Sequence, residues 1–259
     1  MTLAENELSE VRSASGIILY AKHTVVSNSR RLLDIIPQSG GYNTPKLALG
    51  FIPVIRELVM ARTNTREEII RKGAELIHAQ GFKATGLQQI LQAADIPKGS
   101  FYFYFKSKED FGLEIIDYFN AIISGIFTRY LSDKKIPPLK RMGKLFEYFE
   151  AAFQKSGYSL GCPIGNLSLE LADTNERLRL HLEGVIETLI AQIELCLQEA
   201  KRDKSIPASM NAADTARFIF HGFEGAVLHM KVVKSIEPIR TFRSFLKGYF
   251  KNIKALEKR

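Results

Sequence analysis

One short segment concentrates side chains that can hydrogen-bond to a nucleic acid. Lysine ammonium groups attract phosphates, and serine and tyrosine hydroxyls can bond to phosphate oxygens or to base edges. A glycine among them lets the backbone approach a partner closely. The segment supplies all of these groups within eleven residues: Lys98, Gly99, Ser100, Tyr102, Tyr104 and Lys108.

Two predicted helices joined by a tight turn would present these side chains. Thr85 and Gln88 fit a capping box that begins the first helix. Asp95 lies at the turn, and Pro97 pre-sets the backbone for the second helix. Apolar residues recur at the three- and four-residue spacing of a core-facing side on both helices: Leu87, Ile90, Leu91, Phe101 and Phe105.

This pattern predicts a helix-turn-helix, whose second helix fits the DNA major groove and places its first residues on base edges. The alternative is that the run FYFYF is only an aromatic core segment. That reading is disfavoured because both sides of a short helix would have to be buried. The candidate DNA-binding residues are Thr85, Gln88, Lys98, Gly99, Ser100, Tyr102, Tyr104 and Lys108.

The run KGSFYFYFKSKED resembles the most diagnostic part of the TetR family of bacterial repressors. There, a Lys-Gly-Ser/Thr-Leu/Phe-Tyr-x-x-Phe string ends the reading head, and Ser-Lys-Glu begins the helix that leads to the ligand domain. The match is close from Arg66 to about Asp110. Two residues depart from the family pattern: Asp95 replaces the usual glycine at the turn, and Tyr104 replaces a common histidine.

The resemblance implies an all-α fold, with an N-terminal three-helix helix-turn-helix DNA-binding domain and a C-terminal helical ligand-binding and dimerisation domain. Residues 1–59 differ, because they are rich in Ser, Asn, Gly and Pro clusters and show no lasting periodicity. We expect residues 1–59 to be an extension that is either disordered or a start-site artefact upstream of Met60. Residues 60–110 would form the DNA-binding domain, and residues 111–259 the helical ligand-sensing and dimerisation domain.

Composition sets broad limits on function. The 259 residues are 46% hydrophobic and 25% charged, as in a soluble protein with a sizeable core. A net charge of +8 suits a polyanionic partner. Residues 60–110 nevertheless hold 8 Lys/Arg against 6 Asp/Glu, so the motif rather than the charge carries the DNA prediction.

Other classes of function are disfavoured by the sequence. No run approaches the roughly 18 apolar residues that span a bilayer, and the first residues lack the order of a secretory signal. Cys162 and Cys196 are too few for a disulfide framework and lack metal-ligand spacing. We therefore expect a cytoplasmic protein that is not an enzyme, with no cofactor, no metal and no membrane association.

From Ser107 onward the sequence predicts only helices. A reading head this small needs two copies to recognise a specific site. The last two helices are rich in apolar residues and contain Gly222, Gly225 and Ala226, which permit close packing. In the family the corresponding helices form a four-helix bundle across a two-fold axis, so the resemblance implies a homodimer through about residues 211–256. The alternative is that these stripes face only the chain's own core.

Cys162, in the run SLGCPIGNLSLEL, lies just before a predicted helix, a position that lowers the pKa of a thiol. A similar string occurs in an electrophile-responsive branch of the TetR family, typified by the repressor of N-ethylmaleimide reductase. There the cysteine acts with a lysine of the penultimate helix, which Lys231 matches. The resemblance implies that Cys162 and Lys231 sense an electrophile or another small-molecule inducer. The alternative is a buried loop cysteine.

Together these patterns predict a dimeric TetR-type repressor that a small molecule or an electrophile releases from a palindromic DNA operator. Two other functions stay open: an all-helical enzyme with Cys162 as nucleophile, and a helical adaptor that binds protein. The enzyme reading is disfavoured, because no histidine or acid lies at a motif spacing from Cys162 and the sequence has no nucleotide-binding fingerprint. Five aromatic residues of the middle region are predicted to be core: Phe119, Phe127, Phe146, Phe149 and Phe153.

Overall fold

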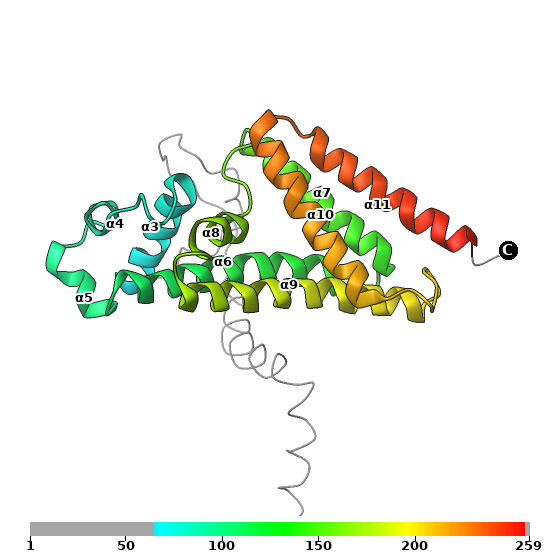
Figure 1. Ribbon diagram of the computed structural model, residues 1–259, viewed down its shortest axis with the longest axis horizontal. Helices are drawn as coiled ribbons and strands as arrows, with labels where there is room; N and C mark the ends of the chain where they lie inside the picture. Colours follow the sequence, from blue (N-terminus) through cyan, green and yellow to red (C-terminus); the bar gives the residue numbers. More distant parts are fainter. Residues whose placement is uncertain (1–64, 257–259) are drawn as a thin grey trace, which may run out of the picture.

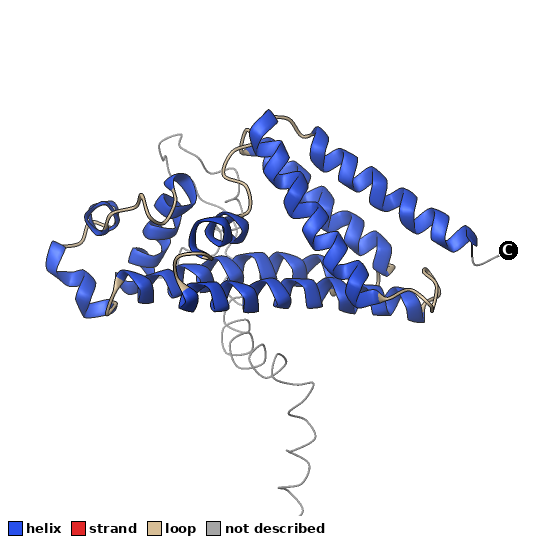
Figure 2. Cartoon of the chain, viewed as in Figure 1, coloured by secondary structure: helices blue, strands red, loops and turns tan. Residues whose placement is uncertain are grey.

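The computed structural model describes residues 65–256, and these residues form helices joined by turns, without a strand (Figure 2). The predicted all-α fold is confirmed. The predictions for residues 1–59 and for a start at Met60 lie outside the described residues.

The reading head consists of short helices at one end of the molecule (Figure 1). It contains α3 (Thr65–Gln80), α4 (Leu87–Ala93), a 3₁₀ turn (Lys98–Ser100) and α5 (Phe101–Tyr104). The remaining helices form the larger domain: α6 (Lys108–Leu131), α7 (Pro138–Lys155), α8 (Pro163–Leu171), α9 (Glu176–Arg202), α10 (Ala212–Val233) and α11 (Glu237–Leu256).

Helix α6 begins beside the reading head and runs into the larger domain alongside α9 (Figure 1). The predicted domain boundary at residue 110 therefore falls in the first turn of a continuous helix. A rigid helix of this kind can carry a displacement at one end of the molecule to the other.

Side chains at the helix starts explain several boundaries. The hydroxyl of Ser107 accepts a hydrogen bond from Asp110 N at 3.0 Å, as the sequence predicts. Asn211 caps α10 in the same way. The cap of α9 is Asn175, whose side chain accepts a hydrogen bond from Leu178 N at 2.9 Å. Asn175 lies directly before the first residue of α9, which is the position from which a side chain caps a helix.

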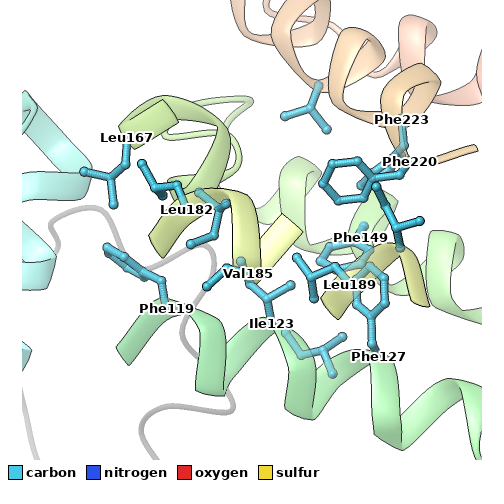
Figure 3. Close-up of a cluster of buried hydrophobic side chains, with 14 of the residues drawn as sticks. Phe119, Ile123, Phe127, Phe149, Leu167, Leu182, Val185, Leu189, Phe220 and Phe223 are labelled. Carbon is cyan, nitrogen blue, oxygen red and sulfur yellow. The ribbon is translucent and has the colours of Figure 1, made fainter. Parts of the chain in front are cut away.

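The core of the larger domain is a continuous cluster of apolar side chains from α6, α7, α9 and α10 (Figure 3). The five aromatic residues predicted to be core are all buried. The rings of Phe127, Phe146, Phe149 and Phe153 pack against one another or against Phe223, whereas the ring of Phe119 contacts His78 and Tyr118. By length and composition alone, α6 could cross a membrane, although charged residues interrupt its apolar sequence. Its apolar face is buried against its neighbouring helices, which accounts for that composition.

Candidate functional site

The turn between α4 and α5 has the geometry of a helix-turn-helix. Asp95 adopts a left-handed conformation, with φ of 56°. Aspartate tolerates this region better than most residues, which explains how it replaces a glycine here. Ile96 N then bonds to Leu91 O at 2.9 Å and closes the turn.

The start of α4 differs from the predicted capping box by one residue. Gln89, rather than Gln88, reaches back and accepts a hydrogen bond from Gly86 N at 2.8 Å. Thr85 is fully buried, and its hydroxyl donates to Gly81 O at 2.6 Å. Thr85 therefore closes the loop after α3, and the prediction that it contacts DNA is wrong for this conformation. Gln88 is exposed, as a DNA contact requires.

The second helix of the motif separates its aromatic residues between two sides. Phe101 and Phe105 are buried, with their ring centroids 5.5 and 4.9 Å from that of Phe111. Tyr102 and Phe103 instead are 66% and 83% exposed. The alternative of a purely aromatic core segment is therefore wrong. We call the exposed surface formed by Gly99, Tyr102 and Phe103 the outer face.

The other candidate residues lie around the outer face. Gly99 is exposed, and an added Cβ would meet no atom within 4 Å, so the backbone there is open to a partner. Ser100 and Tyr104 are half-buried. The 3₁₀ turn includes the backbone of Lys98. Phe103 was not predicted, although the spacing of Phe101 and Phe105 already implied that a residue between them points outward.

Lys108 is half-buried and contacts the loop after α3. Its ammonium donates to Phe82 O at 2.8 Å and lies 4.8 Å from the centroid of the Phe82 ring. Burial lowers its pKa, and the carboxylate of Glu170 acts against that shift. The sequence predicted that Lys108 would contact DNA, but the structure uses its ammonium to hold the loop after α3.

That loop is the junction between the reading head and the larger domain. The carboxylate of Glu170, on α8, accepts hydrogen bonds from Phe82 N at 2.8 Å and Lys83 N at 2.5 Å. Gly81 has φ of 92°, and an added Cβ would lie 3.1 Å from the same carboxylate. The ring of Phe82 is 8% exposed and packs against Gly112 of α6. We call the surface formed by Phe82, Thr85 and Lys108 the inner face.

Cys162 also lies at the junction, directly before α8. Its Sγ accepts a hydrogen bond from Gly165 N at 3.4 Å, as expected of a residue at a helix N-terminus. Burial, followed by the carboxylate of Glu224, nevertheless raises the pKa of the thiol well above its ordinary value. The prediction of a lowered thiol pKa is therefore wrong, because desolvation and a nearby acid outweigh the helix terminus.

Lys231, on α10, lies beside the loop that contains Cys162, but its ammonium bonds to Asn166 rather than to the thiol. Its ammonium donates to Asn166 Oδ1 at 3.1 Å, and its stem packs against Gly161. His78, on α3, bonds through Nε2 to Gly161 O at 3.1 Å. The loop before α8 is thus in contact with both the reading head and the penultimate helix.

The last two helices carry an uncovered apolar surface. On α10 and α11, several large apolar side chains are exposed along one stripe of each helix. Ring contacts join Phe242 of α11 to Phe146 and Phe223, so α11 also packs on its own chain. The exposed residues, which we call the apolar stripe, are Phe218, Leu228, Val232, Phe245 and Tyr249.

Comparison with known proteins identifies both parts of the chain. Residues 69–115 match the family described as bacterial regulatory proteins, tetR family, and residues 138–246 match the tetracyclin repressor-like C-terminal domain. The transcriptional repressor DhaR of Mycobacterium sp. (strain GP1) is 32% identical over 183 residues, which cover 71% of this chain and 90% of DhaR. The repressor NemR of Escherichia coli (strain K12) is 27% identical over 185 residues, covering 71% of this chain and 93% of NemR.

Solved structures agree with these relatives. A TetR regulatory protein from Rhodobacter sphaeroides has a TM-score of 0.66 at 30% identity and covers 71% of this chain and 97% of its own. The reduced form of E. coli NemR has a TM-score of 0.67 at 28% identity and covers 72% of this chain and 97% of its own. The relatives are named as transcriptional regulators and not as enzymes. The chain therefore belongs to the TetR family of DNA-binding transcriptional regulators.

Proposed function

We propose that this regulator is a dimeric repressor that binds a palindromic operator in the bacterial cytoplasm and leaves it when a small molecule or an electrophile reaches the junction. The observation that carries the proposal is the outer face, where Tyr102 and Phe103 are exposed beside a closed helix-turn-helix turn. Aromatic side chains this exposed bury little of their surface within the chain and are available to a partner.

The outer face would enter the major groove of the operator. Gly99 would allow close approach, and Tyr102 would offer its hydroxyl to a phosphate or a base edge. The ring of Phe103 can make an apolar contact with a thymine methyl group. Further contacts would come from residues at the margins of this face: Gln88, Lys98, Ser100 and Tyr104.

A mobility shift with the DNA that flanks the protein's own gene tests operator binding. We expect the native protein to bind this DNA and Tyr102→Ala to lose roughly 1–3 kcal/mol of binding free energy. Lys140→Ala, an exposed residue on α7, is the control and should bind as the native protein does. Equal binding by native protein and Tyr102→Ala would remove the outer face from the interface.

The apolar stripe supports a homodimer through α10 and α11. Contiguous exposed apolar surface on a soluble protein marks an interaction site. A two-fold axis would place the stripes of two copies against each other and give the two reading heads that a palindrome requires. Sedimentation at micromolar concentration should show a dimer, and Phe218→Glu should convert it to a monomer. A monomeric native protein would contradict this part of the proposal.

Cys162 and Lys231 would take part in sensing, in keeping with the resemblance to the electrophile-responsive branch. Cys162 is half-buried and the pKa of its thiol is raised, so little thiolate is available at neutral pH and reaction with an electrophile would be slow unless the surroundings of the thiol change. Operator release by N-ethylmaleimide should be lost in Cys162→Ser and kept in Cys196→Ser, the control for the other free cysteine. Unchanged release from Cys162→Ser would exclude a covalent signal at this residue.

A further inference from the structure

A cleft of about 270 Å³ lies between the C-terminal end of α3 and helix α8, with further walls from α6 and α10. Figure 1 shows α8 placed between α3 and α10, where the reading head meets the larger domain. The volume is at the low end of the range for ligand pockets, so an occupant would be small. Apolar and polar groups share its lining: Ile77, Phe119, Leu167, His78, Asn166 and Lys231.

Lys231 gives this cleft its charge. Among the described residues its ammonium forms no ion pair, and its hydrogen-bond partner is the neutral amide oxygen of Asn166. Burial, followed by the positive charge of Lys234, lowers the pKa of Lys231. A partly buried cation without a counter-ion is unfavourable, and an anion placed beside it would recover that free energy.

The other ionisable groups of the cleft do not neutralise Lys231. The carboxylate of Glu170 is engaged by Phe82 N and Lys83 N, and it also stabilises the charge of Lys108. Desolvation lowers the pKa of His78 to about 4, so its ring is neutral at pH 7. The cleft therefore has the Lys231 ammonium beside an apolar wall, while the carboxylate of Glu170 in another wall is bound to the loop after α3.

We propose that this cleft binds a small organic anion, a carboxylate that pairs with Lys231 and lays a short apolar tail against Ile77, Phe119 and Leu167. This inference rests on the proposed repressor function and names the class of its reversible effector. One wall of the cleft is α3, and Glu170 in another wall holds the loop after α3. A bound molecule therefore touches the reading head directly, and its occupancy releases the operator.

Hexanoate and its neutral isostere hexanamide test the charge requirement. At constant ionic strength, hexanoate should raise the thermal midpoint of the native protein and weaken its operator binding, whereas hexanamide should do neither. Lys231→Met should weaken hexanoate binding at least tenfold. Lys231→Arg, which keeps the charge, should retain the preference for hexanoate over hexanamide.

Lys234→Met is the matched control, because Lys234 is a cation directly after the same helix that does not line the cleft. It should change hexanoate binding less than threefold. Equal binding of hexanoate and hexanamide, or unchanged hexanoate binding by Lys231→Met, overturns the proposal. Hexanoate binding without any loss of operator affinity overturns it as well, because an effector must act on DNA binding.

These outcomes are distinct from failure of the proposed function. If the ligand-free protein does not bind the DNA flanking its gene, the repressor proposal fails at that step. The thermal midpoint would still report whether hexanoate binds through Lys231.

Discussion

Phe103 and Phe82 are both phenylalanines of the reading head, yet one is 83% exposed and the other is 8% exposed. Phe103 lies on the outer face, where its ring centroid is 5.0 Å from that of its neighbour Tyr104. Phe82 lies on the inner face, where its ring packs against Gly112 of α6 and against the ammonium of Lys108 at the start of the same helix. The same residue type is thus open to a partner on one face and packs within the protein on the other.

The difference implies that operator affinity and stability can be changed separately. Substitutions on the outer face would remove contacts that form only in the DNA complex, so they should not change the unfolding free energy of the free protein. Substitutions on the inner face remove contacts between the reading head and the larger domain. These should lower stability and alter how the reading head is held.

The largest effect is expected for Phe82→Ala. Removing a buried phenylalanine leaves a cavity beside Gly112 and should cost roughly 3–5 kcal/mol of unfolding free energy. Phe103→Ala, the same substitution on the outer face, should change stability by no more than about 0.5 kcal/mol. Denaturant unfolding of both variants measures the contrast, and similar losses would mean that the two faces do not differ as described.

The next effect concerns His78, which joins the inner side of α3 to the loop before α8. Desolvation lowers the pKa of His78 from its ordinary value of 6.5 to about 4 in the folded protein. The unfolded chain therefore binds this proton first, and stability falls as the pH drops from 6.5 towards 4. The contribution is at most about 3 kcal/mol.

Unfolding of the native protein and of His78→Gln across this pH range measures that contribution. The stability difference between them should change in the window between pH 4 and 6.5 and stay constant above it. A difference that does not vary with pH would show that His78 is not desolvated at the junction.

A smaller effect is expected for Phe103 in operator recognition. If its ring contacts a thymine methyl, Phe103→Ala should weaken binding by roughly 1 kcal/mol. Replacing individual thymines of the operator by deoxyuridine removes the same methyl from the DNA side. At the contacted position, the native protein should lose affinity on this replacement and Phe103→Ala should not. Equal sensitivity of both proteins at every position would exclude the contact.

The sequence predicted the elements well because their signals are local. The capped start at Ser107, the left-handed Asp95 and the buried pair Phe101 and Phe105 each depend on residues within one or two turns. The capping of α4 was predicted one residue too early, since two adjacent glutamines satisfy nearly the same pattern and only the fold selects Gln89.

The roles of inner-face residues could not be predicted from the sequence. Glu170 binds loop amides 87 and 88 residues away along the chain, and no spacing rule connects such positions. The same holds for Cys162, whose helix-terminal position indicated a reactive thiol. Its pKa is decided instead by burial and by Glu224, which comes from a distant helix. Non-local contacts therefore determine the candidate sensing site.

The smallest effect separates two neighbouring lysines, Lys106 and the inner-face residue Lys108. Lys106 is exposed, whereas the ammonium of Lys108 is bound to Phe82 O. A lysine that contacts a phosphate contributes about one unit to the slope of log affinity against log salt concentration. If Lys106 lies near the DNA backbone, Lys106→Met should reduce this slope by about one. The same substitution should leave the unfolding free energy unchanged. Lys108→Met should leave the slope unchanged and cost about 1 kcal/mol of stability, because one internal hydrogen bond is lost. Titrations of operator DNA at several salt concentrations distinguish them, and a reduced slope for Lys108→Met would return that residue to the outer face.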